Sequence, residues 1–208
     1  HKPEHVFTFE DALMGYRELL QTERFLASAL TTAFQTAVFF AMMGFIAYSF
    51  ERMSISPKEF GVWMATTSVG YVIGNLANKR LLKRYRIEII TLVGAIASLT
   101  SLLLMGIWYD AAPNSPTGLA IPMFLVGLSN GVIIANSIII ASSALPRLRG
   151  SATGLVGAMQ MGAGGISGTV AIWLGADQNT HVGIFTLIVI SFCSLLSAWW
   201  SSKLERPQ

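Results

Sequence analysis

Apolar residues run along this chain in six long stretches, and short polar segments separate them. The stretches lie at about residues 25–50, 60–78, 87–109, 117–145, 151–175 and 181–201. A helix needs about 20 consecutive apolar residues to cross the hydrocarbon core of a bilayer. The pattern therefore predicts an all-α, polytopic membrane protein in which residues 25–201 form a bundle of six transmembrane helices.

Two polar segments flank the predicted bundle. Residues 1–24 are predicted to form a cytoplasmic linker, and residues 202–208 a cytoplasmic tail. Within the linker, four apolar side chains fall on one helical face: Phe9, Leu13, Tyr16 and Leu20. This spacing predicts an amphipathic helix, which either lies on the membrane surface or is solvated as part of the linker.

The distribution of Lys and Arg predicts which side of the membrane each loop faces. The short loop after the second stretch holds five of the fourteen cations: Lys79, Arg80, Lys83, Arg84 and Arg86. With six spans, twelve cations fall on the side of this loop and two, Arg52 and Lys58, on the other. Because cytoplasmic loops are enriched in Lys and Arg, we expect this loop and both termini to be cytoplasmic.

The composition argues against several other classes of protein. The chain is 53% hydrophobic and only 12% charged, whereas about 25% is usual for a soluble domain. Its net charge of +3 comes from cations at helix ends, so we expect no nucleic-acid partner. The three histidines and the single Cys193 are scattered, so we predict no metal site, no cofactor and no catalytic set. Because the first residue is His1, we expect the chain to be a fragment.

Uncharged polar side chains recur at mid-depth in four of the stretches. Amide groups in hydrocarbon need partners or water, and interhelical hydrogen bonds are their commonest use. Because four helices carry such groups, we favour a shared polar cavity, which neighbouring Met and aromatic side chains would make adaptable. The residues predicted to contact substrate or water there are Gln35, Tyr71, Asn75, Asn130, Asn136 and Gln160.

Charged groups are missing from the predicted membrane depth. No Asp, Glu, Lys, Arg or His falls clearly inside a stretch, although proton pathways in membranes normally need such a group. These six helices alone are therefore not predicted to form a proton pump. Glu88 lies at the inner end of the third stretch, where snorkelling or pairing within the loop would satisfy it. In the fifth stretch, small residues spaced by four predict close approach of a neighbouring helix: Gly150, Gly154, Ala158 and Gly162, and then Gly164 and Gly168.

The segment that contains the basic loop resembles a known motif. This motif, G-x-L-x-D-R-x-G-R-[KR], is the cytoplasmic loop motif of the major facilitator superfamily, here in its second-half copy. Gly74, Leu76 and Lys83 match it, Asn78 and Lys79 stand where it has Asp and Arg, and two further positions depart from it. Residues 146–160 look like the start of helix eleven in drug:proton antiporters of the bicyclomycin/chloramphenicol resistance (Bcr/CflA) type.

The resemblance covers the chain after about Tyr16 and implies a six-helix half of such a transporter, helices seven to twelve. The missing N-terminal half, in the same or a separate chain, would be its partner and would carry the proton-binding acid. The resemblance implies proton-coupled efflux of small drug-like or amphiphilic compounds by alternating access, in the bacterial inner membrane. The residues assigned to the cytoplasmic gate are Gly74, Asn78, Lys79, Arg80, Lys83 and Arg84.

Two alternatives to multidrug efflux stay open. The first is an exporter of one metabolite, such as an amino acid or a siderophore, for which a narrow cavity with fixed hydrogen-bond donors is expected. The second is a non-transporting membrane sensor or partner subunit of the same fold, for which a dry packing surface is expected.

Overall fold

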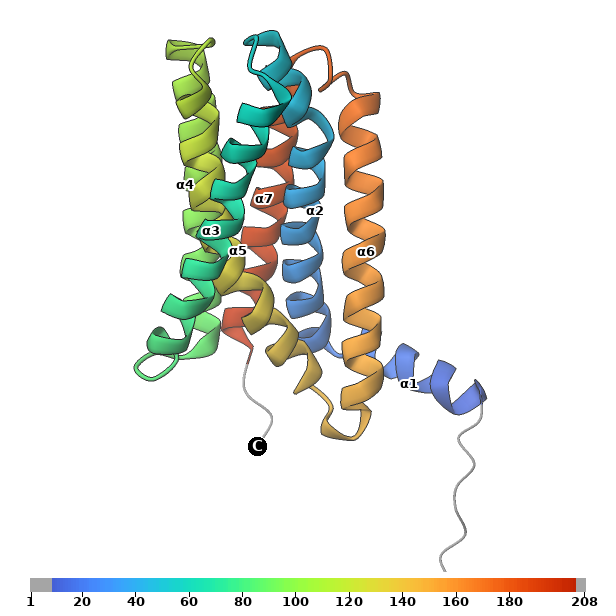
Figure 1. Cartoon of the computed structure of the whole chain (residues 1–208). Coiled ribbons are helices and arrows are strands. Elements are labelled where there is room, and N and C mark those ends of the chain that lie inside the picture. The colour runs from blue at the N-terminus through green and yellow to red at the C-terminus, as the bar shows by residue number, and fades with distance from the viewer. Residues whose placement is uncertain (1–8, 205–208) are drawn as a thin grey trace, which may run out of the picture.

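The computed structural model describes residues 9–204, which form helices joined by short loops (Figure 1). Two short elements, α1 (Phe9–Gln21) and the 3-10 turn η1 (Pro146–Leu148), accompany six long helices. The long helices are α2 (Glu23–Arg52), α3 (Pro57–Leu81), α4 (Ile87–Ala111), α5 (Pro116–Ser142), α6 (Arg149–Trp173) and α7 (Thr180–Lys203). The predicted all-helical class is confirmed, and each long helix begins and ends within three residues of a predicted stretch.

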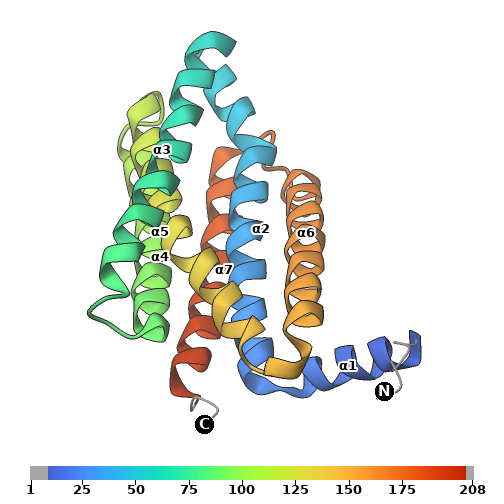
Figure 2. The same ribbon diagram turned by 60° about the horizontal axis from the view of Figure 1, so that its bottom comes forward.

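Five of the long helices are long and apolar enough to cross a membrane: α2, α4, α5, α6 and α7. Helix α3 has 25 residues but is less apolar, because Gly, Thr, Ser and Asn interrupt its sequence. It nevertheless lies alongside α5 within the bundle (Figures 1 and 2). The sixth membrane span therefore stays a prediction.

Helix α3 begins at a capping box. The Glu59 backbone N–H donates to the Ser56 hydroxyl at 3.3 Å, and the Ser56 backbone N–H donates to the Glu59 carboxylate at 3.1 Å. Pro57 occupies the first turn, where its missing N–H costs nothing. The Ser56 hydroxyl, followed by the Ser56 backbone N–H, holds the pKa of Glu59 below its ordinary value.

The six long helices form two triplets, α2 to α4 and α5 to α7, that pack against each other in corresponding ways. Helix α2 packs against α6 and α7 of the second triplet, and α5 packs correspondingly against α3 and α4 of the first. The two leading helices, α2 and α5, also contact each other at the centre of the bundle. Because each triplet has an odd number of helices, the second enters from the opposite end, which gives the inverted repeat common in transporters.

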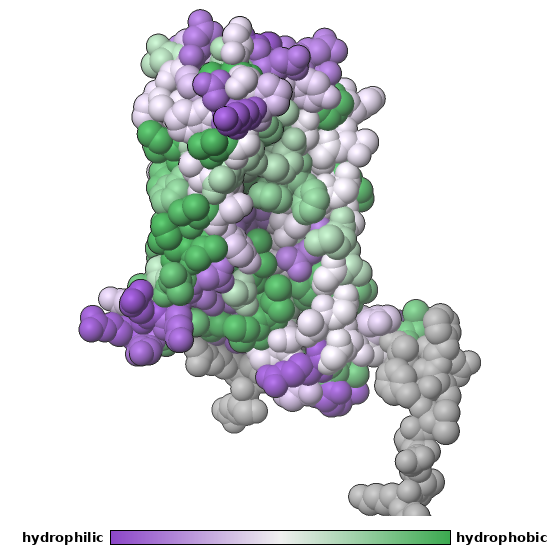
Figure 3. All heavy atoms as spheres, viewed as in Figure 1, coloured by the Kyte–Doolittle hydropathy of each residue, from purple (hydrophilic) through white to green (hydrophobic). Residues whose placement is uncertain are grey.

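The main core lies where α2 and α5 meet α4 and α7. Its fully buried side chains include Met42, Phe45, Leu102, Met105, Met123 and Leu187. Large apolar side chains on the outer faces of α4, α6 and α7 are exposed instead, for example Ile107, Ile166 and Phe185. Hydrophilic residues gather at both ends of the molecule and an apolar band lies between them (Figure 3), as expected for a protein surrounded by lipid.

Helix α1 projects sideways from the end of the bundle at which α2 begins (Figures 1 and 2). Leu19 is fully buried beside Phe25 and Val156, and Glu18 forms an ion pair with Arg147 in η1. Leu13 stays exposed. The helix thus forms where the linker was predicted to contain one. The start of the linker before residue 9 and the tail after residue 204 lie outside the described residues.

Candidate functional site

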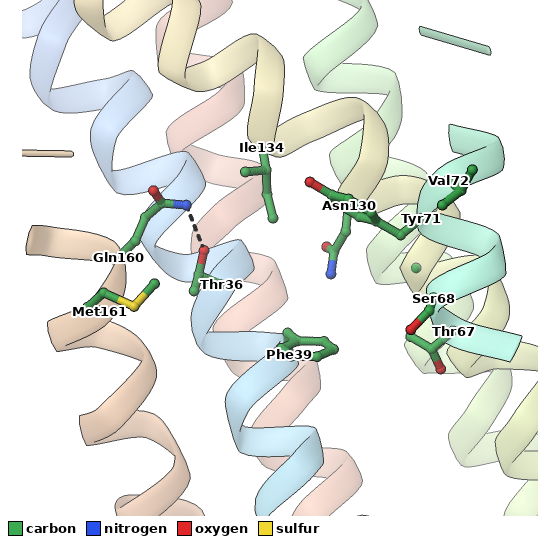
Figure 4. A pocket seen from close by; sticks show the side chains of 11 residues that line it. Thr36, Phe39, Thr67, Ser68, Tyr71, Val72, Asn130, Ile134, Gln160 and Met161 are labelled. Atoms are coloured by element: carbon green, nitrogen blue, oxygen red, sulfur yellow. Dashed lines mark hydrogen bonds between the residues drawn. The ribbon is translucent and has the colours of Figure 1, made fainter. Parts of the chain in front are cut away.

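A cavity of about 410 Å³ opens between α2, α3, α5 and α6. Its lining residues are Thr36, Phe39, Thr67, Ser68, Tyr71, Val72, Gly127, Asn130, Ile134, Gln160 and Met161. Figure 4 shows the α6 side chains facing those of α3 across the cavity, with Phe39 of α2 between them. The lining combines aliphatic, aromatic and thioether surface with hydroxyl and amide groups, and it contains no Asp, Glu, Lys, Arg or His.

A buried amide network fixes one wall of the cavity. Gln35 is fully buried on α2, and its Nε2 donates to Asn130 Oδ1 at 2.6 Å and to Ser98 Oγ at 2.8 Å. Because Asn130 accepts through its carbonyl oxygen, its amide nitrogen is the group that is turned toward the cavity (Figure 4). Gln35 therefore orients the carboxamide of Asn130 from behind the wall.

Gln160 presents a second oriented amide from the opposite wall. Its Nε2 donates to the hydroxyls of Thr32 and Thr36, each at 3.0 Å. Both hydrogens of the amide nitrogen are thus occupied by α2. The carbonyl oxygen of Gln160 remains an acceptor for a group in the cavity, so the two walls offer one donor and one acceptor.

Thr67 adds a polar atom that has no partner. Its side chain lines the cavity and is only 3% exposed, yet its hydroxyl makes no hydrogen bond within residues 9–204. The Oε1 atom of Gln35 is in the same condition. Buried polar atoms are normally paired. Unpaired atoms at or behind a cavity wall therefore indicate places where water or a ligand completes the hydrogen bonding.

Glycines bring α3 and α5 into backbone contact and so place this wall. A Cβ atom at Gly74 would lie 2.1 Å from the carbonyl oxygen of Leu128, and one at Gly127 would lie 2.2 Å from that of Thr67. Gly70 and Gly131 make equally close approaches. Any side chain at these positions would force the two helices apart.

The structure brings three of the six predicted cavity residues to the lining: Tyr71, Asn130 and Gln160. Gln35 does not line the cavity, and it orients Asn130 from behind the cavity wall by a hydrogen bond to its carbonyl oxygen. Asn75 is half-buried and lies outside the lining, and its Nδ2 donates to the Tyr71 carbonyl oxygen at 2.9 Å. Asn136 is fully buried elsewhere.

Asn136 forms a reciprocal pair with Asn78, one of the predicted gate residues. Asn78 Nδ2 donates to Asn136 Oδ1 at 2.8 Å, and Asn136 Nδ2 donates to Asn78 Oδ1 at 3.0 Å. Both side chains are buried between α3 and α5. This pair, together with Gly74, connects the two helices at the end nearest the basic loop.

The remaining gate residues are exposed cations. Lys79 and Arg80 occupy the last turn of α3, and Lys83 and Arg84 the turn that follows. None of these four cations forms an ion pair with any residue between 9 and 204. Among the described residues, these four cations therefore present unneutralised positive charge.

Two sequence-based expectations are met only in part by the structure. Glu88 is buried and pairs with Arg24 of α2 at 3.0 Å, in addition to a 3.6 Å contact with Arg86 of its own loop. The contact with Arg86 is the expected pairing within the loop, but the carboxylate does not snorkel, because it is buried and also joins α4 to α2. In α6, a Cβ atom added at Gly154 or Gly162 would meet no atom within 4 Å. Of the α6 glycines, only Gly164 and Gly168 approach α2. The close approach predicted for α6 is therefore found at Gly164 and Gly168, while the tightest backbone contacts lie between α3 and α5.

Sequence reasoning missed several lining residues, notably Thr36, Phe39, Ser68 and Met161. Thr36 could have been found from its spacing of four from Thr32, because both hydroxyls then face one side of α2. Phe39 resembles any other apolar side chain in a hydrophobic stretch. Met161 carries one signal, since it follows Gln160 directly and is one of the neighbouring Met side chains expected to make the cavity adaptable. The part of the chain that the structure describes holds no group of three side chains able to bind a metal.

A helical membrane bundle with an inverted repeat and a cavity of mixed polarity is the architecture of a membrane transport protein. The family model of the Major Facilitator Superfamily matches residues 25–208, and the chain belongs to this superfamily. It is therefore a multi-pass membrane protein of a family of secondary transporters that move small molecules. No curated protein matches the chain significantly.

Proposed function

We propose that the chain is the C-terminal six-helix half of a proton-coupled exporter of small drug-like or amphiphilic compounds. The observation that carries this proposal is the cavity between α2, α3, α5 and α6. Phe39, Val72 and Met161 would accommodate apolar parts of varied shape. The amides of Asn130 and Gln160 and the hydroxyl of Thr67 would hydrogen-bond a polar group on the same compound.

The partner in this proposal is an N-terminal six-helix half, in the same or a separate chain. The cavity lies on the face between α3 and α6, where such a half would close it during alternating access. Because no carboxylate among residues 9–204 lines the cavity, the proton-binding acid is assigned to the partner half. Both termini would lie in the cytoplasm of a bacterial cell, with the protein in the inner membrane.

The exposed cations at the end of α3 are assigned to the cytoplasmic gate. Lys79, Arg80, Lys83 and Arg84 would pair with acidic groups or helix C-terminal ends of the other half when the gate closes. Asn78 and Gly74 would hold α3 against α5 so that the pair moves as a unit. The cavity favours transport over a purely structural role, because a sensor or scaffold needs no such opening.

A transport assay tests the proposal. Full-length protein in liposomes should export a fluorescent amphiphilic dye only when a proton gradient is imposed. Gln160→Leu removes a predicted contact and should raise the KM for the dye about tenfold, as expected for loss of a hydrogen bond to substrate. Gln178→Leu, an exposed change in the loop before α7, is the control. Gradient-independent dye movement, or an unchanged KM in Gln160→Leu, would contradict the assignment.

A further inference from the structure

A second hollow lies between α3 and α4, away from the substrate cavity. It has a volume of about 350 Å³, and α5 forms its floor. Its lining residues are Leu81, Tyr85, Ile89, Ile90, Val93, Gly94, Ala97, Leu128, Ser129 and Val132. The only hydroxyl on the floor, that of Ser129, donates to the carbonyl oxygen of Leu125 at 2.9 Å. Apart from the Tyr85 hydroxyl at the basic end, the described residues of the groove therefore offer an apolar surface with no unpaired side-chain polar group.

The groove has the depth of one leaflet of a membrane. Its residues on α4 run from Ile89 to Ala97, which corresponds to about 12 Å at 1.5 Å per residue. Half of a hydrocarbon core is about 15 Å. Ile89 and Val93 are exposed on the rim, so the groove is open along its side to the surrounding acyl chains.

A basic concavity adjoins the groove at the end of the bundle. It is lined by Leu82, Lys83, Arg84, Tyr85, Arg86 and Ile87, so Tyr85 belongs to both hollows. Backbone hydrogen bonds from Lys83 to Arg80 and from Arg84 to Leu81 shape the turn. In the view of Figure 3, the hydrophilic loop between α3 and α4 lies at the lower left, directly below apolar surface.

We propose that these two hollows bind one anionic phospholipid from the leaflet at the basic end of the protein. One acyl chain occupies the apolar groove between α3 and α4. The phosphate lies in the basic concavity, where Lys83 and Arg84 supply positive charge and the Tyr85 hydroxyl donates a hydrogen bond. Arg86 adds a weaker attraction, because it also contacts Glu88 at 3.6 Å.

Charge complementarity selects this occupant. Lys83 and Arg84 have no acidic partner in the described part of the chain, and basic clusters immediately beside a membrane helix attract anionic headgroups. A free phosphate ion would leave the groove unfilled, and a neutral lipid would leave the charges unpaired. The proposal goes beyond the transport function and does not depend on which compound is exported.

Native mass spectrometry of the full-length protein in detergent tests the proposal with phosphatidylglycerol and phosphatidylcholine of identical chains. Retention of phosphatidylglycerol should exceed that of phosphatidylcholine at least fivefold. In the variant Lys83→Gln/Arg84→Gln it should fall at least tenfold, because each cation near a membrane surface contributes about fivefold. Lys79→Gln/Arg80→Gln carries the same change of net charge one turn away, outside both hollows, and should retain the lipid.

The groove is tested separately. Ala97→Phe places a ring in the groove from an exposed position and should lower retention of phosphatidylglycerol by a similar factor. Ile96→Phe, on the neighbouring exposed position outside the lining, should not. Equal retention of the two lipids, equal losses in the two charge variants, or full retention by Ala97→Phe would each overturn the proposal. So would binding of glycerophosphoglycerol, the headgroup without chains, as tightly as the lipid.

Discussion

At the scale of single residues, the same side-chain type takes three different roles in this protein. Asn130 is oriented by Gln35 and faces the cavity, Asn136 pairs with Asn78 inside the bundle, and Asn75 bonds to its own helix. All three occupy positions that the sequence marks as polar groups within a membrane helix. Sequence spacing identifies such groups, but the neighbour that each one meets depends on how the helices are rotated.

The buried pair between Arg24 and Glu88 yields a prediction at this scale. Glu88→Ala removes the carboxylate partner of a largely buried cation at 3.0 Å. Breaking a buried ion pair from one side typically costs 3–5 kcal/mol, so we expect the free energy of unfolding to fall by about 3 kcal/mol. Reversible unfolding in mixed micelles, followed by tryptophan fluorescence, measures this change.

Arg86→Ala is the matched control for this experiment. Its guanidinium is more than half exposed and lies 3.6 Å from the same carboxylate, so removing it should cost about 0–1 kcal/mol. If the two variants lose the same stability, the buried pair is not the stronger contact and the assignment fails.

At the scale of elements, the contact between α3 and α5 decides where the cavity lies. Only Thr67, Gly70, Gly74 and Asn78 of α3 are buried, and they are spaced by three or four residues on one face. The glycines let the two backbones touch, while the remaining faces of α3 point to the cavity and outward. Helix α6 contains more glycine than α3, yet several of its glycines face open space, and Gly164 meets the side chain of Phe40 and not a helix backbone.

The close contact between α3 and α5 predicts that substitution of two glycines of α3 will change the stability of the protein by different amounts. Gly74→Ala places a methyl group about where the Leu128 carbonyl oxygen now lies and should destabilise the protein by about 1–3 kcal/mol. Gly61→Ala meets no atom within 4 Å and should be neutral or stabilise the helix by up to about 1 kcal/mol. Thermal unfolding in detergent compares the two. Equal effects would mean that α3 and α5 can move apart at Gly74 without loss of stability, which would contradict the prediction.

At the scale of the whole molecule, charge and packing together set an orientation. The basic loop, the start of α2 and the end of α7 lie at one end of the bundle (Figure 1). Lys58, at the start of α3, lies at the other. Cations concentrate at the cytoplasmic ends of membrane helices, so the end that carries Lys83 is predicted to be cytoplasmic.

Cysteine accessibility tests this orientation. In a Cys193→Ser background, Lys83→Cys should react with a membrane-impermeant maleimide only after the cells are opened. Lys58→Cys, which is also exposed, should react in intact cells. The reverse pattern would place the basic loop outside, and reaction of both residues in intact cells would contradict the crossing of α3.

The sequence by itself determined the helical class, the approximate ends of all six long helices and the separation of cations between the two ends. These properties depend on local composition, since a long apolar stretch bounded by charge has few other structures available in a bilayer. It also identified three of the eleven lining residues, Tyr71, Asn130 and Gln160, because polar side chains at membrane depth are rare enough to stand out. Only the tertiary structure decided that Asn136 pairs with Asn78, that Glu88 joins α4 to α2, and that Phe39 and Met161 face the cavity. Such facts depend on the rotation and separation of helices distant in sequence, which the glycine contact between α3 and α5 sets and no local pattern records.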